Sequence, residues 1–244
     1  MWEEAVKICH LSVLFVACAG LVFAQTPLLL RSTPPAPEEV LQALEALGLP
    51  PEFTATFSAA LLSGFATGRA TTTVSLLLLQ DLVKLPRDQV LECLEVIRYA
   101  LSQGFIVDTG LAGSSMMNEA RKFLALGRSG EEIVSVLRAR LGFLLATRSV
   151  LVRSGLISPP VMDPQVPATS ADRVVLELAW AVGDFILWEG GSPGDPRFLG
   201  YVQDRLNRLS ALGVCPMEAG KIASALTPAM LAEIVQLAFQ PERR

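Results

Sequence analysis

Histidine is almost absent from this sequence, since His10 is the only one in 244 residues. Nucleophilic systems of the Ser-His-Asp and Cys-His types need a histidine base, and most zinc sites use at least one histidine. His10 lies in an N-terminal segment that we expect to be removed, so these classes are excluded for the mature chain. We therefore favour a non-catalytic protein without a metal ion or other cofactor.

Charged side chains are also scarce. They make up 18% of the residues, against 51% hydrophobic residues, and the formal net charge is −4. This composition argues against disorder and favours densely packed helices, or a surface that meets a partner or a membrane. The small net charge and the absence of a Lys/Arg run exclude a nucleic-acid partner, and a protein partner is expected instead.

The N-terminus carries the pattern of a secretory signal peptide. An apolar run over 11–23 ends in Val22-Phe23-Ala24, a small-residue cleavage pattern in front of Gln25. We expect residues 1–24 to be cleaved between Ala24 and Gln25. The mature protein would then be extracytoplasmic, either periplasmic or secreted.

Two alternatives to cleavage stay open. The leading segment has Glu3 and Glu4 against only Lys7, so it lacks the basic character of most signal peptides. An uncleaved segment would anchor the chain in a membrane through residues 11–24. Lipid modification of Cys18 would anchor it as a lipoprotein. A membrane partner is expected only in these two cases.

Few cysteines remain after the predicted cleavage. Cys93 and Cys215 are the only two left, and an oxidising compartment would permit a disulfide between them. Two cysteines in separate helical segments do not make a disulfide framework, however, so free thiols are the other possibility.

Apolar residues at helical spacing and proline- or glycine-rich breaks divide the rest of the chain. We expect a Pro-rich tether over 25–36, a helical lobe over 37–156, a Pro-rich linker over 157–169 and a second helical lobe over 170–240. Phe105–Val107 is interpreted as a buried connector. The expected helices run from Pro37 to Gly48, from Pro51 to Gly68, from Thr71–Thr73 to Pro86, and over 87–103, 109–126, 130–154, 170–189, 196–212, 216–226 and 228–239.

A hinge between two helices recurs along the chain. Gly127 ends one predicted helix, and Ser129 with Glu132 forms a capping box that starts the next. Ala-Leu-Gly occurs at 46–48, 125–127 and 211–213. The sequence therefore predicts an all-α fold, either an irregular multi-helix bundle or a short α-solenoid of Gly-hinged helix pairs. Chance and the C-capping preference of glycine explain the recurrence equally well.

One predicted helix carries a candidate ligand site. Glu177, Trp180, Asp184 and Trp188 fall on one stripe of the helix over 170–189. Carboxylates flanked by indoles suit a sugar or a cationic ligand, or a hydrolase. A cleft with both carboxylates unpaired would favour this hypothesis, and arginine partners would argue against it. The alternative is that both acids pair with arginines of the long helix, such as Arg138, Arg148 or Arg153.

The sequence thus predicts an exported, non-catalytic helical protein that acts as an interaction or scaffold module of the envelope or periplasm. The alternatives are a small-ligand or carbohydrate-binding protein or hydrolase that uses the stripe, and a membrane-anchored helical protein. No motif identifies the partner.

Overall fold

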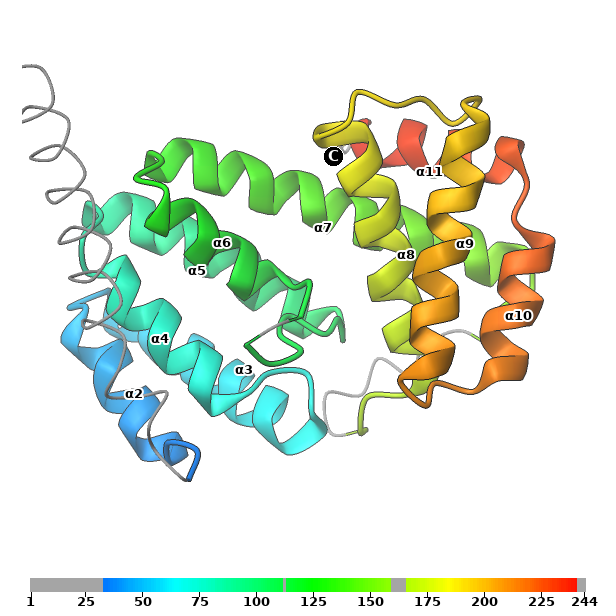
Figure 1. Ribbon diagram of the computed structural model, residues 1–244. Coiled ribbons are helices and arrows are strands. Elements are labelled where there is room, and N and C mark those ends of the chain that lie inside the picture. The colour runs from blue at the N-terminus through cyan, green and yellow to red at the C-terminus, as the bar shows by residue number, and fades with distance from the viewer. Residues whose placement is uncertain (1–32, 112, 159–165, 241–244) are drawn as a thin grey trace, which may run out of the picture. The chain divides into compact units, whose positions relative to one another are not determined.

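The long helix α7 (Gly130–Arg153) runs through the middle of the helical part that begins at Ala36 (Figure 1). The computed structural model describes residues 33–111, 113–158 and 166–240, without the side chains of residues 216–218. In this part of the chain we find ten α-helices and no strand, which confirms the all-α prediction. The helices are α2 (Pro37–Ala46), α3 (Pro51–Thr67), α4 (Thr72–Leu82), α5 (Arg87–Ser102), α6 (Met116–Ala125), α7 (Gly130–Arg153), α8 (Ser170–Leu187), α9 (Pro196–Ala211), α10 (Pro216–Ala225) and α11 (Pro228–Phe239).

The predicted hinge before α7 has the expected local geometry. Gly127 has a φ of 67°, a left-handed conformation that an L residue with a side chain rarely adopts. Ser129 then caps α7: its Oγ accepts a hydrogen bond from the backbone N–H of Glu132, and its own N–H donates to the Glu132 carboxylate at 2.9 Å. These bonds satisfy two backbone donors at the helix start, so the chain can turn sharply without losing them.

Helix α6 is shorter than the sequence predicted. We expected a helix over 109–126, but α6 begins only after Ser115, whose hydroxyl caps it by accepting from the N–H of Asn118. The preceding residues form a turn instead, in which the carboxylate of Asp108 accepts from the N–H of Gly110. Gly110 has a φ of 93°, which is incompatible with a helix. The prediction was wrong here because a Gly-rich first turn was counted as helix.

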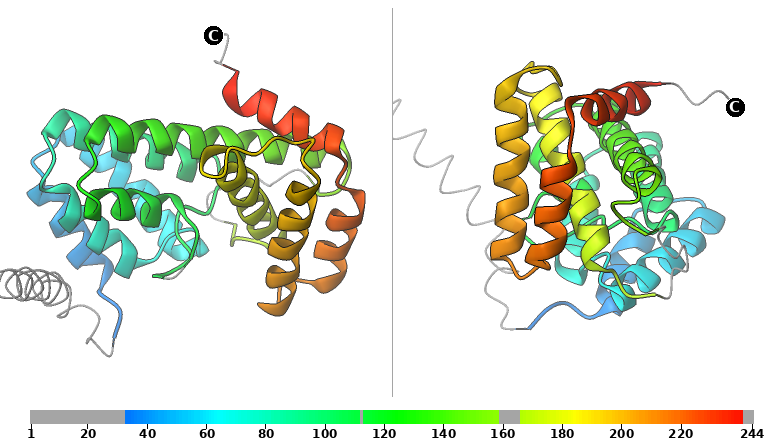
Figure 2. Two further views of the ribbon diagram at one scale, coloured as in Figure 1. Left: turned by 45° about the horizontal axis from the view of Figure 1, so that its top comes forward. Right: turned by 90° about the vertical axis from the view of Figure 1, so that its right-hand side faces the viewer.

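Helix α7 lies against four neighbours. It packs on α5, α6, α8 and α11. Helices α8, α9 and α10 pack side by side in chain order (Figure 2). Helix α7 belongs to the first predicted lobe, and α8 and α11 belong to the second. Helix α7 therefore contacts helices of both predicted lobes.

The residues from Ala36 onward form one compact unit. Arg69, which is only 4% exposed, joins distant parts of it: Nε donates to the carbonyl of Gly104 at 2.8 Å and Nη1 to the carbonyl of Val166 at 2.5 Å. The expected signal peptide, its cleavage site at Ala24 and Gln25, and most of the tether lie outside the described residues.

Within the described ranges, no single helix has both the length and the apolar character needed to cross a membrane. Only one combination passes the same criteria, namely residues Ala219–Ala225 of α10 together with α11, and these two segments are bent by 95°.

Candidate functional site

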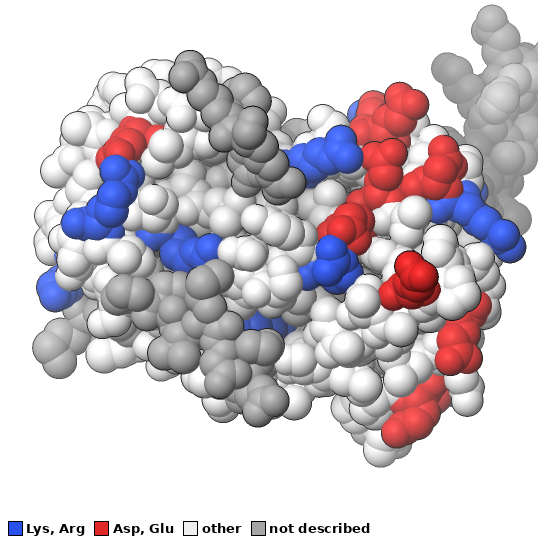
Figure 3. Space-filling view, turned by 180° about the vertical axis from the view of Figure 1, so that it is seen from behind, with Lys and Arg blue, Asp and Glu red and all other residues white. Residues whose placement is uncertain are grey.

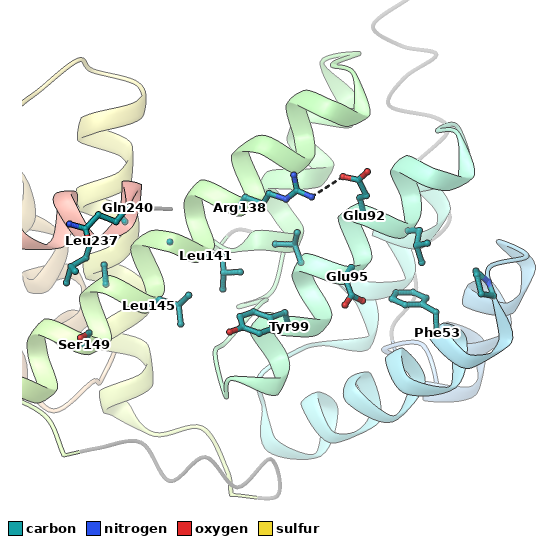
Figure 4. Close-up of a pocket in the computed structure, with 16 residues that line it drawn as sticks. Phe53, Glu92, Glu95, Tyr99, Arg138, Leu141, Leu145, Ser149, Leu237 and Gln240 are labelled. Carbon is teal, nitrogen blue, oxygen red and sulfur yellow. Dashed lines mark hydrogen bonds and ion pairs between the residues drawn. The ribbon is translucent and has the colours of Figure 1, made fainter. Parts of the chain in front are cut away.

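A large apolar groove lies between α5, α7 and α11, with the start of α3 at one end (Figure 4). Its volume is about 1110 Å³. Leu141 and Leu145 of α7 line its middle, Tyr99 of α5 lies on one side, and Leu237 of α11 lies at the far end. Most of the other lining side chains are also apolar. The groove therefore offers an extended apolar surface rather than a polar catalytic pocket.

The groove exists because α7 is apolar on more than one face. Leu137 and Leu144 are fully buried in the core, whereas Leu141 and Leu145 are only half-buried. Leu141 and Leu145 extend the apolar surface of α7 beyond the core face that Leu137 and Leu144 form. The signal for the groove was therefore an apolar stripe on α7 wider than a single core face needs.

One end of the groove depends on a close helix contact. A Cβ atom at Gly142 of α7 would lie 2.6 Å from the carbonyl oxygen of Ala238, so a side chain at this position would displace α11. The glycine lets the two helices approach closely. The contact fixes the last turn of α11, including Leu237, as the wall of the groove.

Charged residues are found at the other end, where α5 borders the groove. Arg138 of α7 donates to Glu92 at 3.1 Å, and Arg98 donates to Glu95 at 2.8 Å. The hydrogen bond from Arg98 holds the pKa of Glu95 below its ordinary value. These pairs are exposed, so they shape the rim and contribute little stability.

The acidic character of this end extends beyond the rim. Residues 36–103 contain eight acidic and four basic side chains, which gives a net charge of −4, while residues 104–244 contain fourteen of each. Figure 3 shows acidic side chains gathered over the N-terminal helices, on the right of the view, beside a largely uncharged middle. The net charge of the protein thus lies in the segment that includes α2 to α5.

The residues of the predicted stripe do not lie at this groove. Trp180, Asp184 and Trp188 line a second, smaller and polar cavity of about 380 Å³ between α6, α7, α8 and α9. Glu177 is not among the residues that line it. The carboxyl of Glu177 is half-buried, and burial raises its pKa. The structure therefore brings three of the four predicted residues together and leaves Glu177 apart.

Asp184 is held by cations. One carboxylate oxygen accepts from Arg140 at 2.6 Å, and the other accepts from Arg205 at 3.0 Å and from the hydroxyl of Tyr201 at 3.4 Å. Arginine partners were expected for this acid if the stripe were structural, and one does come from the long helix. It is Arg140 rather than the three arginines named from the sequence. Those contact other groups: Arg138 pairs with Glu92, Arg148 donates to the Gln103 carbonyl and Arg153 pairs with Glu233.

Arg140 is the most deeply buried charge at this cavity, with an exposed fraction of 1%. Its Nη2 also donates to Glu119 of α6 at 3.1 Å, and its guanidinium lies 4.7 Å from the ring centre of Trp180. Gly183 provides the space, since a Cβ atom there would lie 2.6 Å from Nη1. Neither Nε nor Nη1 has a hydrogen-bond partner in the described part of the chain. Sequence periodicity did not identify Arg140 or Glu119, because their pairing joins two different helices.

Trp188 lies at the edge of the polar cavity and is 51% exposed. Its ring contacts Phe123 with the ring centres 5.5 Å apart, and the ammonium of Lys122 lies 5.3 Å from its ring centre. These contacts from α6 hold an indole that still has half of its surface open to solvent.

The two cysteines of the predicted mature chain are free thiols in the structure. Cys93 is buried in α5, and burial raises its pKa to about 12. Cys215 is exposed at the start of α10. Over the described residues, no group of three or more His, Cys, Asp or Glu side chains could hold a metal ion.

We compared the chain with known proteins. No protein-family model, no curated protein and no solved structure matches it.

Proposed function

We propose that this protein is a non-catalytic interaction module whose apolar groove binds an amphipathic helix of a protein partner. The observation that carries the proposal is the groove itself, about 1110 Å³ in volume and lined mainly by apolar side chains of three helices. A helix with its side chains is about 10–12 Å across, and helices bind such grooves through residues at i, i+3, i+4 and i+7. Leu141, Leu145 and Leu237 would contact these residues.

The distribution of charge favours a partner with basic residues at one end. All of the net charge of −4 lies in residues 36–103, whereas the rim acids Glu92 and Glu95 each already pair with an arginine. The attraction therefore comes from the net charge of this segment and not from free carboxylates at the rim. A helix with Lys or Arg beside its apolar face would place them over this acidic end. Such complementarity mainly sets the orientation of the partner and the rate of association.

A small apolar ligand, such as a fatty acid, is the less suitable occupant. Sites for small ligands usually have volumes of about 300–1000 Å³. The groove, at about 1110 Å³, is larger than this range, and its lining is spread over α5, α7 and α11 (Figure 4). An elongated occupant with one apolar face fits this extended lining better.

Export and the helical repeat belong to the same proposal. We infer that residues 1–24 are a signal peptide and that the protein acts outside the cytoplasm, with anchoring through residues 11–24 or Cys18 as the alternative. The apolar run before Ala24 supports this inference. We also propose that the Gly-hinged helix pairs form a short solenoid. This proposal is supported by four glycines that each follow a helix and have a positive φ, a conformation that ends a helix: Gly48, Gly68, Gly127 and Gly213.

Selection of peptides tests the groove. The full mature chain would be screened against a displayed library of helical peptides, and the affinity of the selected peptides would be measured by fluorescence anisotropy. We expect apolar residues at helical spacing with basic residues on one side, and a loss of affinity of at least about tenfold with Leu141→Glu, equal to 1.4 kcal/mol or more. Leu212→Glu is the matched control, because Leu212 is 74% exposed and does not line the groove.

Two outcomes would contradict the proposal. One is a set of selected peptides that bind Leu141→Glu as tightly as the wild type. The other is a loss of peptide affinity in Leu212→Glu that does not occur in Leu141→Glu. The mass of the mature protein in fractionated cells tests export separately: a start at Gln25 in an extracytoplasmic fraction supports it, and a full-length cytosolic product overturns it.

A further inference from the structure

We propose that the polar cavity between α6, α7, α8 and α9 binds an uncharged, polyhydroxylated ligand of the pyranose sugar class, which stacks on Trp188. This proposal is independent of the apolar groove, because the two sites share no lining residue. The volume of the cavity, about 380 Å³, lies within the range of about 300–1000 Å³ found for small-molecule sites.

The cavity is lined by hydrogen-bonding groups from several elements. Ser114 and Asn118 come from the start of α6, Glu119 from its first turn, and Tyr201 from α9. Trp188 contributes an apolar ring at the edge. A few converging polar groups beside an aromatic ring are typical of sites for sugars, whose faces are apolar and whose edges carry hydroxyls.

The charges at the cavity are balanced. The acids that line it are Glu119, Asp184 and Glu189. The cations are Arg140 and Lys122, which also line it, and Arg205, which pairs with Asp184. Three negative and three positive side chains leave no excess of either sign. A strongly charged ligand would therefore gain little here, whereas a neutral ligand meets no net repulsion.

A cationic ligand is further disfavoured because a cationic side chain already lies near each indole ring. The guanidinium of Arg140 lies 4.7 Å from the ring centre of Trp180, and the ammonium of Lys122 lies 5.3 Å from that of Trp188. A second cation near either ring would be repelled by the first. The open half of Trp188 remains available to an uncharged apolar face.

Glu119 can accept hydrogen bonds from sugar hydroxyls. It accepts only one hydrogen bond from a side chain of the described residues, from Arg140, so further lone pairs are available. Asp184 already accepts three bonds, two of them from arginines. These arginine partners argue against a ligand-binding role for Asp184 itself, so the proposal rests on Glu119 and on the ring of Trp188. The sequence had placed this role on Glu177 and Asp184.

Saturation-transfer NMR with the full mature chain tests the proposal. The probes are glucose and N-acetylglucosamine as neutral sugars, choline as a cation and inorganic phosphate as an anion. We expect saturable binding of at least one sugar with a dissociation constant in the millimolar range, and a loss of at least tenfold in Trp188→Ala. Trp188→Phe, which keeps an aromatic face, should retain most of the affinity.

The matched control is Phe239→Ala, because Phe239 is also an aromatic residue that is half exposed, at 52%, but it does not line the cavity. It should bind the sugar as the wild type does, as should Leu141→Glu, which separates this proposal from the groove. Three results would overturn it: no sugar bound in the millimolar range, preferential binding of choline or phosphate, or unchanged sugar affinity in Trp188→Ala.

Discussion

The apolar groove and the polar cavity differ in how their residues are held, although α7 contributes to both. Arg140 and Leu141 are consecutive residues, yet Arg140 is buried at the cavity and Leu141 is half-buried in the groove. Charges at the groove are exposed pairs on the rim, whereas Arg140 and Glu119 at the cavity are buried, and Arg140 is shared by two carboxylates. Residues of the cavity should therefore support the fold, and residues of the groove should be replaceable without unfolding it.

The largest expected effect is on the cavity side. Arg140→Leu removes the cation between Glu119 and Asp184, which leaves the buried Glu119 without its arginine and Asp184 with Arg205 and Tyr201 only. We expect the free energy of unfolding, measured by urea denaturation, to fall by about 3–5 kcal/mol. Arg153→Ala is the control, because its pair with Glu233 is exposed on both sides, and it should change stability by no more than about 1 kcal/mol. Equal effects of the two variants would refute the contrast.

The close packing around Arg140 gives the second prediction. Gly183→Ala places a Cβ atom 2.6 Å from Nη1 of Arg140 and 3.2 Å from the ring of Phe143. We expect a loss of about 1–3 kcal/mol in urea denaturation, since neither neighbour can move freely. Gly200→Ala in α9 has no atom within 4 Å of its new Cβ and should stabilise the helix by up to about 1 kcal/mol. A stabilising Gly183→Ala would show that the cluster is loosely packed.

A smaller effect is expected in the groove. Leu141→Ser removes a half-buried side chain from an open surface, so we expect a loss of about 1 kcal/mol, well below the effect of Arg140→Leu. Leu144 lies three residues further along α7 and is fully buried, so Leu144→Ser should lower the free energy of unfolding several times more. Thermal unfolding monitored by circular dichroism measures both. If the two leucines proved equally important, Leu141 would belong to the core and the groove would be closed in solution.

The smallest effect concerns Glu177, the predicted site residue that lies outside the cavity. Burial raises its pKa above the ordinary value of 4.5, so the folded protein binds a proton here more tightly than the unfolded chain. Stability should therefore fall as the pH rises from 4.5 through the raised pKa. Glu177→Gln should be slightly more stable than the wild type at pH 7, and the difference should vanish below pH 4.5 in urea titrations at several pH values. A less stable Glu177→Gln at pH 7 would mean that the carboxylate is stabilised by its neighbours.

Local features of the fold were predictable from the sequence. The helix that starts at Gly130 followed from Ser129 and Glu132, because a capping box uses only neighbouring residues. Trp180, Asp184 and Trp188 share one cavity because a spacing of four residues keeps side chains on one face of a helix.

Contacts between helices were not predictable in the same way. Arg140 meets Glu119 and Asp184 across three helices, and no periodicity marks which arginine of α7 will be buried. The groove was missed for the same reason. An apolar residue such as Leu141 belongs to the core or to an open surface depending on which helices cover it, and only the tertiary arrangement decides this.

The central claim is that the groove along α7 binds a helix, and site-specific photo-crosslinking tests it most directly. A photoreactive amino acid would replace Leu145 in the groove or, as the control, the exposed Leu212. We predict that a selected helical peptide becomes cross-linked to the protein at position 145 and not at position 212. Cross-linking at position 212, or none at position 145 while the peptide is bound, would contradict the account.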